Sequence, residues 1–482
     1  MRCIRSVVSA LVIPFVSVGC GWILGLDEYS LQTSCPTAEC GVFVSLQGSD
    51  SNSGTKEAPV RTISRAIEVA RDGNGVVQAC AQEFSEPVVV PAGVTLKGGL
   101  NCSGAWEDIG ALVRTTITAG PNVVPLQLLG SSGVTRVDSI NVKAADATAP
   151  GGSSIAVIVE GATAEFARCD IITGNGTAGV KGETPVEDAG PSNPSDPTIV
   201  GGNGVAACSA GASPNSGGLG TTNELCPTAV GGNGGSGDVA TGSNGSDGQP
   251  LPEPNPDAWG VGGTGAMVAG CKSGQDGLLG AEGAPGEGAA AGDLGMLSGS
   301  GFVGAAGKDG GAGSLGQGGG GGGGSKGKAG CGGASGGGGG AGGCGGKGGV
   351  GGQGGGSSIG LISLNADVKF TDVSMTLGNG GAGGEGGDGK VGGVGGSGGI
   401  GGAGANTLKG CDGGSGGQGG FGGKGGGGRG GHSVGIAFTG NGPTPPANVK
   451  LGMAGIGGLG ASMPFDGMAG EAVTSLEMPA MP

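Results

Sequence analysis

The sequence predicts an all-β protein: a right-handed parallel β-helix with a capping helix at its N-terminal end and large glycine-rich insertions. The main observation is an internal repeat, because residues 153–179 recur at residues 357–383 and a shorter third copy begins at Ser433. Each full copy has the pattern of two short strands joined by a tight turn, followed by a glycine-rich tract. A strand module that returns when a glycine tract ends is typical of a solenoid coil with long loops leaving it.

The two full copies match at positions that would stack in successive coils. The identical pairs include Ile155/Ile359, Ile158/Ile362, Phe166/Phe370 and Asn175/Asn379. We therefore predict that Ile155 and Ile359 lie on adjacent rungs, although the whole first glycine tract separates them in the chain.

Composition limits where a core can form. Of the 482 residues 130 are glycine and only 3% are aromatic, whereas glycine is about 7% of an ordinary chain. Each ordered glycine costs additional conformational entropy, so the core is expected in the Val-, Ile- and Leu-bearing strands outside the tracts.

The net charge of −15 excludes a nucleic-acid binder, which needs a basic surface.

Residues 1–20 are typical of an export signal: Arg2 and Arg5 precede an apolar stretch over residues 7–18 and then small residues. Residues 17–20, Ser-Val-Gly-Cys, resemble a bacterial lipobox, in which Cys20 would be lipidated and become the mature N-terminus. The departure is Ser17, where that motif usually has leucine. Two alternatives stay open: plain signal-peptidase cleavage, which would give a secreted chain, and an uncleaved anchor, because residues 7–26 are uncharged.

The residue after the candidate lipidation site adds to the resemblance. Gly21 follows Cys20, and by resemblance to Gram-negative lipoproteins this favours the outer membrane and cell surface. Residues 21–40 then form a short tether. Within it Cys35 and Cys40 are candidates for a small disulfide loop in an oxidising compartment.

The folded part is expected to begin at residue 41, with a strand over residues 42–45 and a polar turn over residues 47–59. Thr62 is a suitable N-cap, and Ile63, Ala66, Ile67 and Ala70 form one apolar helical stripe. Asp72 and Gly73 end that helix. Further strands are predicted, each ending at Gly, Pro or Asn, at residues 76–80, 88–90, 94–96, 115–118, 123–129 and 134–142.

A resemblance rests on this N-terminal segment. The run GSDSNSGTKEAPVRTISRAIEVA at residues 48–70, the later PAGVTLKGGLNC and Trp106 resemble the N-terminal cap of right-handed parallel β-helix proteins of the pectate-lyase-like superfamily. The version concerned is found in bacterial surface lipoproteins with a DUF1565-type opening. The likeness covers about residues 41–180. It implies that the helix plugs the open end of the coil, since a sheet edge needs covering.

The predicted organisation has a signal (1–20), a tether (21–40), a capped β-helix part (41–173) and a first glycine-rich insertion (174–356). A rung (357–377), a second insertion (378–431) and a final rung with a loose C-terminal tail (432–482) follow. The tracts resemble the glycine-rich repeats of mycobacterial PE-PGRS proteins, although the helical PE domain of that family has no counterpart here.

Two structures compete for these tracts: solvated disordered loops and a packed, polyglycine-II-like bundle in which glycine lets backbones touch. The spacing of three residues between Gly277, Gly280, Gly283 and Gly286, together with the return of the strand module, favours the bundle.

The cysteines outside the signal are expected to form disulfides. Cys80 and Cys102 lie at the ends of neighbouring predicted strands and are the first choice. Closeness in sequence favours Cys208 with Cys226 and Cys331 with Cys344, whereas Cys271 and Cys411 could pair across tracts; connectivity cannot be deduced from sequence. Cys169, on a strand, is expected to be buried.

No metal site is predicted, because the chain has no C-x-x-C and only one histidine.

No set of residues suggests catalysis or a cofactor. His432 stands alone and is expected at the surface or in a turn, and hydrolysis would need a histidine held by a partner. A solvated strand face is the pattern formed by Glu160, Glu165, Arg168 and Asp170.

The predicted function is an exported, lipid-anchored, structural or adhesive surface protein without catalytic activity. The alternatives are a polysaccharide-binding or polysaccharide-cleaving β-helix and a self-associating matrix component. The expected partners are accordingly a membrane, extracellular polysaccharide or further copies, and no nucleic acid.

Overall fold

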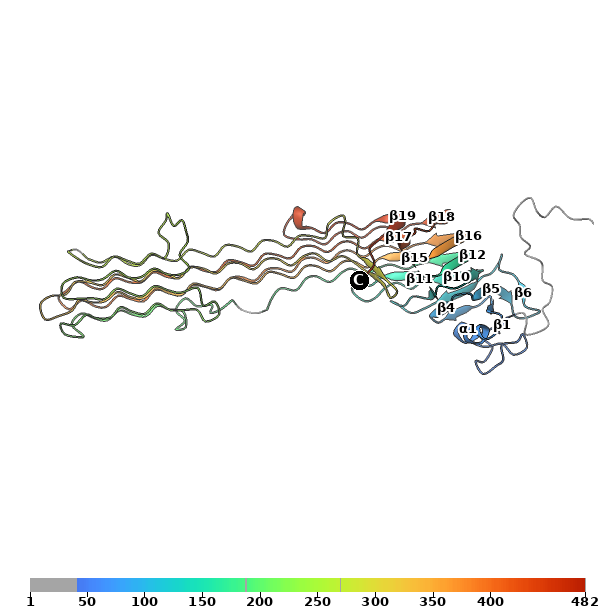
Figure 1. The fold of residues 1–482 in the computed structure, drawn as a ribbon, viewed down its shortest axis with the longest axis horizontal. Helices are drawn as coiled ribbons and strands as arrows, with labels where there is room; N and C mark the ends of the chain where they lie inside the picture. Colours follow the sequence, from blue (N-terminus) through green and yellow to red (C-terminus); the bar gives the residue numbers. More distant parts are fainter. Residues whose placement is uncertain (1–40, 187–188, 269, 482) are drawn as a thin grey trace, which may run out of the picture.

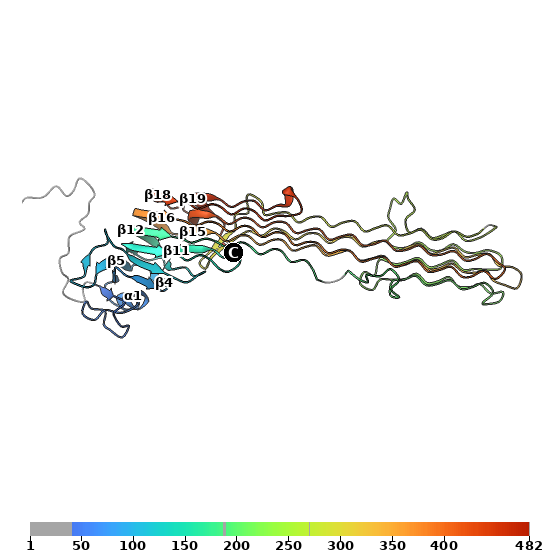
Figure 2. The ribbon, with the colours of Figure 1, turned by 180° about the vertical axis from the view of Figure 1, so that it is seen from behind.

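The computed structural model describes residues 41–186, 189–268 and 270–481, and the molecule is elongated. A solenoid of parallel strands occupies one end, and a long bundle of extended strands leaves it in a single direction (Figure 1). The view from behind shows the same two parts, with no helix in the bundle beyond one short turn (Figure 2). The expected signal and tether, with Cys20, Cys35 and Cys40, lie outside the described residues.

Each complete coil of the solenoid contributes strands to three sides, and neighbouring coils pair in parallel. The first side contains β1 (Val42–Val44), β2 (Val76–Cys80), β5 (Thr95–Asn101), β9 (Val134–Asp138) and the first halves of β12 (Thr163–Ile172) and β16 (Asp367–Thr376). The second side contains β3 (Glu83–Ser85), β7 (Thr115–Thr118), β10 (Ile140–Lys143), the second halves of β12 and β16, and β18 (Asn448–Lys450). The third side contains β4 (Val88–Pro91), β8 (Leu126–Leu129), β11 (Ser154–Glu160), β15 (Ser358–Leu364), β17 (Ser433–Thr439) and β19 (Ala472–Glu477).

The repeat seen in the sequence is the stacking of three coils. Ile155 pairs in register with Ile359, which pairs with Val434 in the third copy. On the first side the Phe166 and Phe370 rings stack, with centroids 5.8 Å apart. The parallel β-helix predicted from the sequence is therefore confirmed, including its most distant pairing.

Left-handed residues turn the chain between the first and second sides. Ser139, Arg168 and Asp372 have φ values of 57°, 51° and 52° and occupy this corner on successive coils. A positive φ is unusual outside glycine, and the bend at Ser139 divides the single strand expected at residues 134–142 into β9 and β10.

The predicted capping helix is α1 (Ile63–Arg71), which lies against β1, β2 and β4 at the first coil. Its apolar stripe is buried, and the Thr62 side chain accepts a hydrogen bond from the Arg65 N–H. The Glu86 carboxylate adds a second cap, because it accepts from the Ile63 and Ser64 N–H groups at 2.7 and 3.2 Å. An acidic group at a helix N-terminus satisfies free donors and matches the helix dipole.

The third side of the solenoid is covered on both faces. Val157, Leu361 and Ile436 point into the coil, whereas Ile158 and Ile362 pack outward. That outer face lies under a hairpin of β13 (Met296–Ser298) and β14 (Gly301–Val303), which inserts Leu297 and Phe302. The sequence did not predict this hairpin inside the first insertion.

The C-terminal tail was expected to be loose, and that prediction is wrong. β19 pairs with β17 along its length, and Met478 is only 3% exposed because it packs with the β13–β14 cluster. The chain end lies beside the hairpin, where the Leu297 N–H donates to the Pro479 carbonyl at 2.9 Å.

The long excursions leave the solenoid at one corner, between its second and third sides. The connections at this corner, from the first coil to the last, are residues 86–87, 119–125, 144–153, 173–357, 377–432 and 451–471. Because the last three leave stacked coils at the same place, their strands run side by side (Figure 1). The Gly176, Gly179 and Gly182 N–H groups donate to the Asn379, Ala382 and Glu385 carbonyls, so the coil-to-coil register continues into the bundle.

The glycine tracts form a packed bundle, the second of the two structures considered from the sequence. Residues 318–324 run through its centre, and successive N–H groups donate to different neighbours, Gly319 to Gly340, Gly320 to Gln275 and Gly321 to Ser246. Their carbonyls accept from three further strands, near residues 232–235, 263–266 and 411–414. Three residues per turn and hydrogen bonds only between strands are the geometry of polyglycine II, the relative of polyproline II.

Close approach explains why glycine is needed at the centre. A Cβ added to Gly318, Gly321 or Gly324 would lie 1.9–2.0 Å from a carbonyl oxygen of a neighbouring strand. Surface strands need glycine only where they face the bundle, which accounts for the three-residue spacing at Gly277, Gly280, Gly283 and Gly286.

Candidate functional site

The densest charged cluster lies at the corner between the first and second sides. The Arg168 guanidinium donates to both carboxylate oxygens of Asp138, at 2.8 and 2.6 Å, and lies 3.5 Å from Asp108. Lys97 lies 3.0 Å from the same Asp108 oxygen. On the adjacent side Arg114 pairs with Asp170, which also accepts the Ser374 hydroxyl at 2.6 Å.

The electrostatics of this cluster favour fixed charges. The hydrogen bond to Asp138 is the main reason that the pKa of Arg168 is raised. Burial alone would raise the pKa of Asp108, but the Gly110 N–H and the Lys97 ammonium together bring it below its ordinary value. A general acid needs a carboxyl pKa raised toward neutrality, so the shift at Asp108 is in the opposite direction. The expected solvated strand face is thus an ion-paired one, with Glu165 also held by Arg136 at 2.9 Å.

Removing the guanidinium from this corner should destabilise the solenoid. Arg168→Met would leave the Asp138 carboxylate, only 9% exposed, without its partner, and breaking a buried ion pair in this way costs about 3–5 kcal/mol. Urea unfolding followed by far-ultraviolet circular dichroism measures the loss. The double variant with Asp138→Leu is expected to recover much of it; equal stability of Arg168→Met and the parent chain would contradict the assignment.

A second buried polar cluster lies where the bundle meets the solenoid. Arg429 is 2% exposed, and its guanidinium donates to the Ala290 and Ala291 carbonyls at 2.8 and 2.9 Å and to the Glu471 carboxylate at 3.0 Å. It therefore fastens the segment before the β13–β14 hairpin to the segment before β19.

His432 belongs to this junction, so its expected place at the surface or in a turn is wrong. It is 1% exposed, its Nδ1 accepts from the Glu471 N–H and its Nε2 lies 2.9 Å from the Leu294 carbonyl. The ring also meets Phe302 edge-on. Sequence reasoning missed this role because both partners of the ring come from segments far away in the chain.

The hydrogen bonds fix the proton on Nε2 and require a neutral ring. Burial is the main cause that lowers the pKa of His432; the Leu294 carbonyl opposes it, and the nearby charges are Arg429 and Glu471. The pKa of His432 is therefore lower in the folded chain than in the unfolded chain, where it is about 6.5. The stabilisation that the neutral ring gives is complete above that unfolded-state pKa and is lost as the pH falls through the folded-state pKa.

We therefore expect acidification below pH 6 to loosen the junction. Thermal unfolding at pH 7 and pH 5, compared between the parent chain and His432→Gln, measures this contribution. The parent should lose more stability than the variant, because glutamine does not titrate. Identical losses in the two proteins would show that His432 contributes nothing to the pH dependence.

Disulfides join strands of the bundle and close the cap. Of the predicted pairs, Cys80–Cys102 and Cys271–Cys411 are present. The pairs Cys208–Cys226 and Cys331–Cys344 are wrong: Cys208 joins Cys331 and Cys226 joins Cys344. The error has a physical cause, because folding of the tract places residues beside partners more than a hundred positions away. Cys169 is free and buried.

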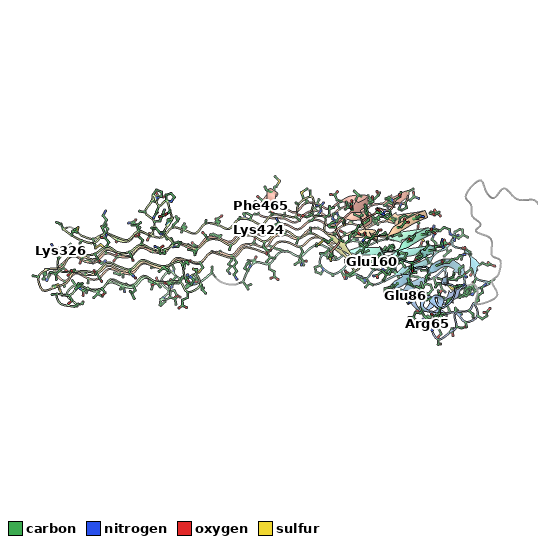
Figure 3. The ribbon with its side chains drawn as sticks, viewed as in Figure 1. Arg65, Glu86, Glu160, Lys326, Lys424 and Phe465 are labelled. Atoms are coloured by element: carbon green, nitrogen blue, oxygen red, sulfur yellow. A yellow bond between two sulfur atoms is a disulfide. The ribbon has the colours of Figure 1, made fainter. Side chains whose placement is uncertain are left out.

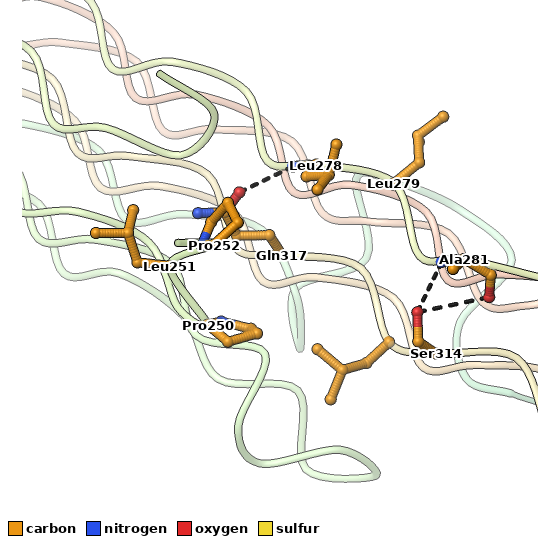
Figure 4. Close-up of a pocket in the computed structure, with 9 residues that line it drawn as sticks. Pro250, Leu251, Pro252, Leu278, Leu279, Ala281, Ser314 and Gln317 are labelled. Atoms are coloured by element: carbon orange, nitrogen blue, oxygen red, sulfur yellow. Dashed lines mark hydrogen bonds between the residues drawn. The ribbon is translucent and has the colours of Figure 1, made fainter. Parts of the chain in front are cut away.

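One hollow on the bundle is shallow and is lined mainly by apolar side chains (Figure 4). It measures about 210 Å³ and lies between Pro250–Pro252 and Leu278–Leu279. Its polar side chains already bind backbone groups. The side-chain amide oxygen of Gln317 accepts from the Leu278 N–H, and the Ser314 hydroxyl accepts from the Ala281 N–H. Ligand pockets usually exceed about 300 Å³ and offer convergent polar groups, so this hollow has little to recognise a ligand.

The described residues hold no candidate for a metal site or for a membrane-spanning helix. They contain no group of three or more His, Cys, Asp or Glu side chains placed to hold a metal ion. None of their helices is long and apolar enough to cross a bilayer. The four disulfides among these residues indicate an oxidising, extracytoplasmic environment.

Comparison with known proteins supports the N-terminal resemblance. A family model described as "Protein of unknown function (DUF1565)" matches residues 46–229. Among solved structures, a pectin methylesterase from Aspergillus niger in deglycosylated form is similar at 14% identity with a TM-score of 0.17. The alignment covers 33% of this chain and 64% of the enzyme, less than two thirds of its length. No curated protein matches the chain.

Proposed function

We propose that the protein is a lipid-anchored, non-catalytic rod at the bacterial cell surface, in which the solenoid is the base and the glycine bundle projects outward. The single observation that supports this most is the saturation of the central strand, whose backbone groups are bonded to neighbours on all sides. Extended polyglycine II rises about 3.1 Å per residue, so a strand such as residues 304–325 spans on the order of 65 Å.

The arrangement of the two parts supports this orientation. Residue 41, which follows the tether, enters the solenoid at β1, and the bundle leaves the solenoid in one direction. Lys326 lies at the far end of the bundle, whereas Arg65 and Glu86 lie in the cap (Figure 3). A lipid on Cys20 would thus hold the base at the membrane and leave the tip of the rod outermost.

Labelling of intact cells tests the proposal. A short epitope inserted at Gly330, in the turn near the tip where a Cβ would meet nothing within 4 Å, should be reached by antibody from outside. The chain should incorporate labelled fatty acid and sediment with membranes, whereas Cys20→Ser should do neither. An epitope hidden until cells are broken, or a Cys20→Ser variant that behaves as the parent, would overturn it.

A second candidate function, polysaccharide binding, is favoured by a polar row on the second side. Thr116, Asn141, Asp170 and Ser374 pair in register across successive coils, and the side-chain amide oxygen of Asn141 is buried without a partner among the described residues. Strands about 4.8 Å apart present such a row as a regular array. Retardation of the parent chain, but not of Asn141→Leu, in polysaccharide-containing gels would support it; equal migration of both in every gel would reject it.

A further inference from the structure

We propose that two copies of this chain associate through the face formed by the last coil, about a two-fold axis near Ile456. This last-coil face consists of β18, residues 451–471 and β19. The proposal does not depend on the anchor or on the orientation at the cell surface. It follows from three features of the face: an apolar stripe, unpaired backbone groups and an open end of the stack.

The stripe lies on the outermost strand of the bundle. Met453, Ile456 and Leu459 are 71%, 72% and 56% exposed. In a helix with three residues per turn, this spacing puts their side chains on one line, about 9 Å apart. No charged residue occurs between Lys450 and Asp466, in a chain whose net charge is −15. Contiguous exposed apolar surface of this kind marks a contact site.

The same strand keeps open hydrogen-bonding positions. Several of its groups are bonded to neighbours, for example the Gly455 and Gly458 N–H groups to the Gly431 and Gly428 carbonyls, both at 2.8 Å. In the described part of the chain, no acceptor faces the Ile456 or Leu459 N–H. The central strand at residues 318–324, in contrast, has neighbours on every side. The bundle therefore ends at this strand while its lattice is still open.

The solenoid also ends without a cover here. Among the described strands, β19 terminates the six-stranded sheet and β18 pairs only with β16. Val449 and Phe438, at the end of the core, are only partly buried. The opposite end of the stack is closed by α1, with β18 and β19 on the side away from it (Figure 1). Head-to-tail stacking would bring this open end against the capped end of another copy, so an open chain of copies is disfavoured and a two-fold contact closes the assembly at two copies.

Antiparallel packing of two such strands is already found inside the molecule. The Gly318, Gly321 and Gly324 N–H groups donate to the Gln249, Ser246 and Ser243 carbonyls, which run in the opposite direction. A two-fold axis near Ile456 sets Ile456 against its counterpart and Met453 opposite the second copy's Leu459. A membrane surface is the less suitable occupant, because hydrocarbon offers no acceptor for the open N–H groups and the free edge of β19.

Sedimentation equilibrium of the purified full chain over the micromolar range provides the test. The parent should form a dimer that tightens as salt screens repulsion between two acidic copies. Ile456→Asp should be monomeric over the same range, whereas Ile400→Asp should still dimerise, because Ile400 is a similarly exposed (62%) outward residue on a different bundle strand. A monomeric parent, or equal losses in the two variants, would overturn the proposal.

Cysteine substitution tests the axis itself. Under mild oxidation Ile456→Cys should give a covalent dimer on its own, because each copy presents this residue to its counterpart, whereas Ile400→Cys should stay uncross-linked. A chain that stays monomeric but floats with anionic vesicles would identify the stripe as a membrane contact and reject the dimer. Neither result bears on the Cys20 experiment, so the two proposals fail separately.

Discussion

Replacing Gly321 by alanine is expected to disrupt the bundle while leaving the solenoid folded. The new Cβ would lie 2.0 Å from the Asn233 carbonyl oxygen and 2.3 Å from its carbon, and these are backbone atoms that no rotamer change can move. The Gly321 N–H is also bonded to Ser246, so the strand cannot shift freely. The cost should exceed the ~1–3 kcal/mol of an overpacked side-chain core.

Limited proteolysis and thermal unfolding measure this effect. Cleavage should appear within the tracts, while a β-rich remnant of the solenoid persists. Gly292→Ala is the matched control, because its Cβ would meet nothing within 4 Å. That change should be neutral, or stabilising by about 0.4–1 kcal/mol through the unfolded chain. If Gly321→Ala were as resistant as Gly292→Ala, the close packing described for the central strand would be wrong.

Reduction of the bundle disulfides is expected to have the second large effect. Cys208–Cys331, Cys226–Cys344 and Cys271–Cys411 close loops with sequence separations of 123, 118 and 140 residues. In the chain-entropy account a loop of about 100 residues is worth up to about 4.7 kcal/mol. Glycine-rich chain is especially flexible when unfolded, so these cross-links restrict an unusually large ensemble.

Scanning calorimetry of Cys226→Ser/Cys344→Ser tests this expectation. The transition of the bundle should move to lower temperature, and the solenoid transition should stay in place. The matched variant Cys80→Ser/Cys102→Ser, which opens a separation of only 22 residues, should show the reverse pattern. Unchanged bundle melting in the first variant would mean that packing alone determines its stability.

The stacking of the coils could be predicted because side chains are repeated where rungs touch. The pairs Ile155/Ile359 and Phe166/Phe370 stand in equivalent positions of the two copies, and the structure pairs them in register. The cap could be predicted for a similar reason, since Thr62 and the stripe that begins at Ile63 are local signals. These features depend on the residue itself and its near neighbours in the chain.

The features that escaped prediction depend on the bundle. Glycine occupies the positions where the tract strands touch, so no side-chain pattern tells which strands become neighbours, and Cys208 could not be matched to Cys331. His432 is held by Leu294 and Glu471, neither of which forms a recognisable motif with it. The β13–β14 hairpin and β19 are short segments. The hairpin is ordered by packing on the outer face of the solenoid, and β19 is ordered by pairing with the last rung. The local sequence does not encode these surfaces.

The central claim is that the glycine tracts are packed strands continuing the coils, and amide hydrogen exchange at residues 318–324 tests it most directly. Each of these N–H groups donates to a neighbouring strand. Exchange should therefore be slow and should require opening of the bundle, with rates comparable to those of amides in β11 and β15. Exchange of all seven glycine amides at the rate of an unstructured peptide would contradict the account.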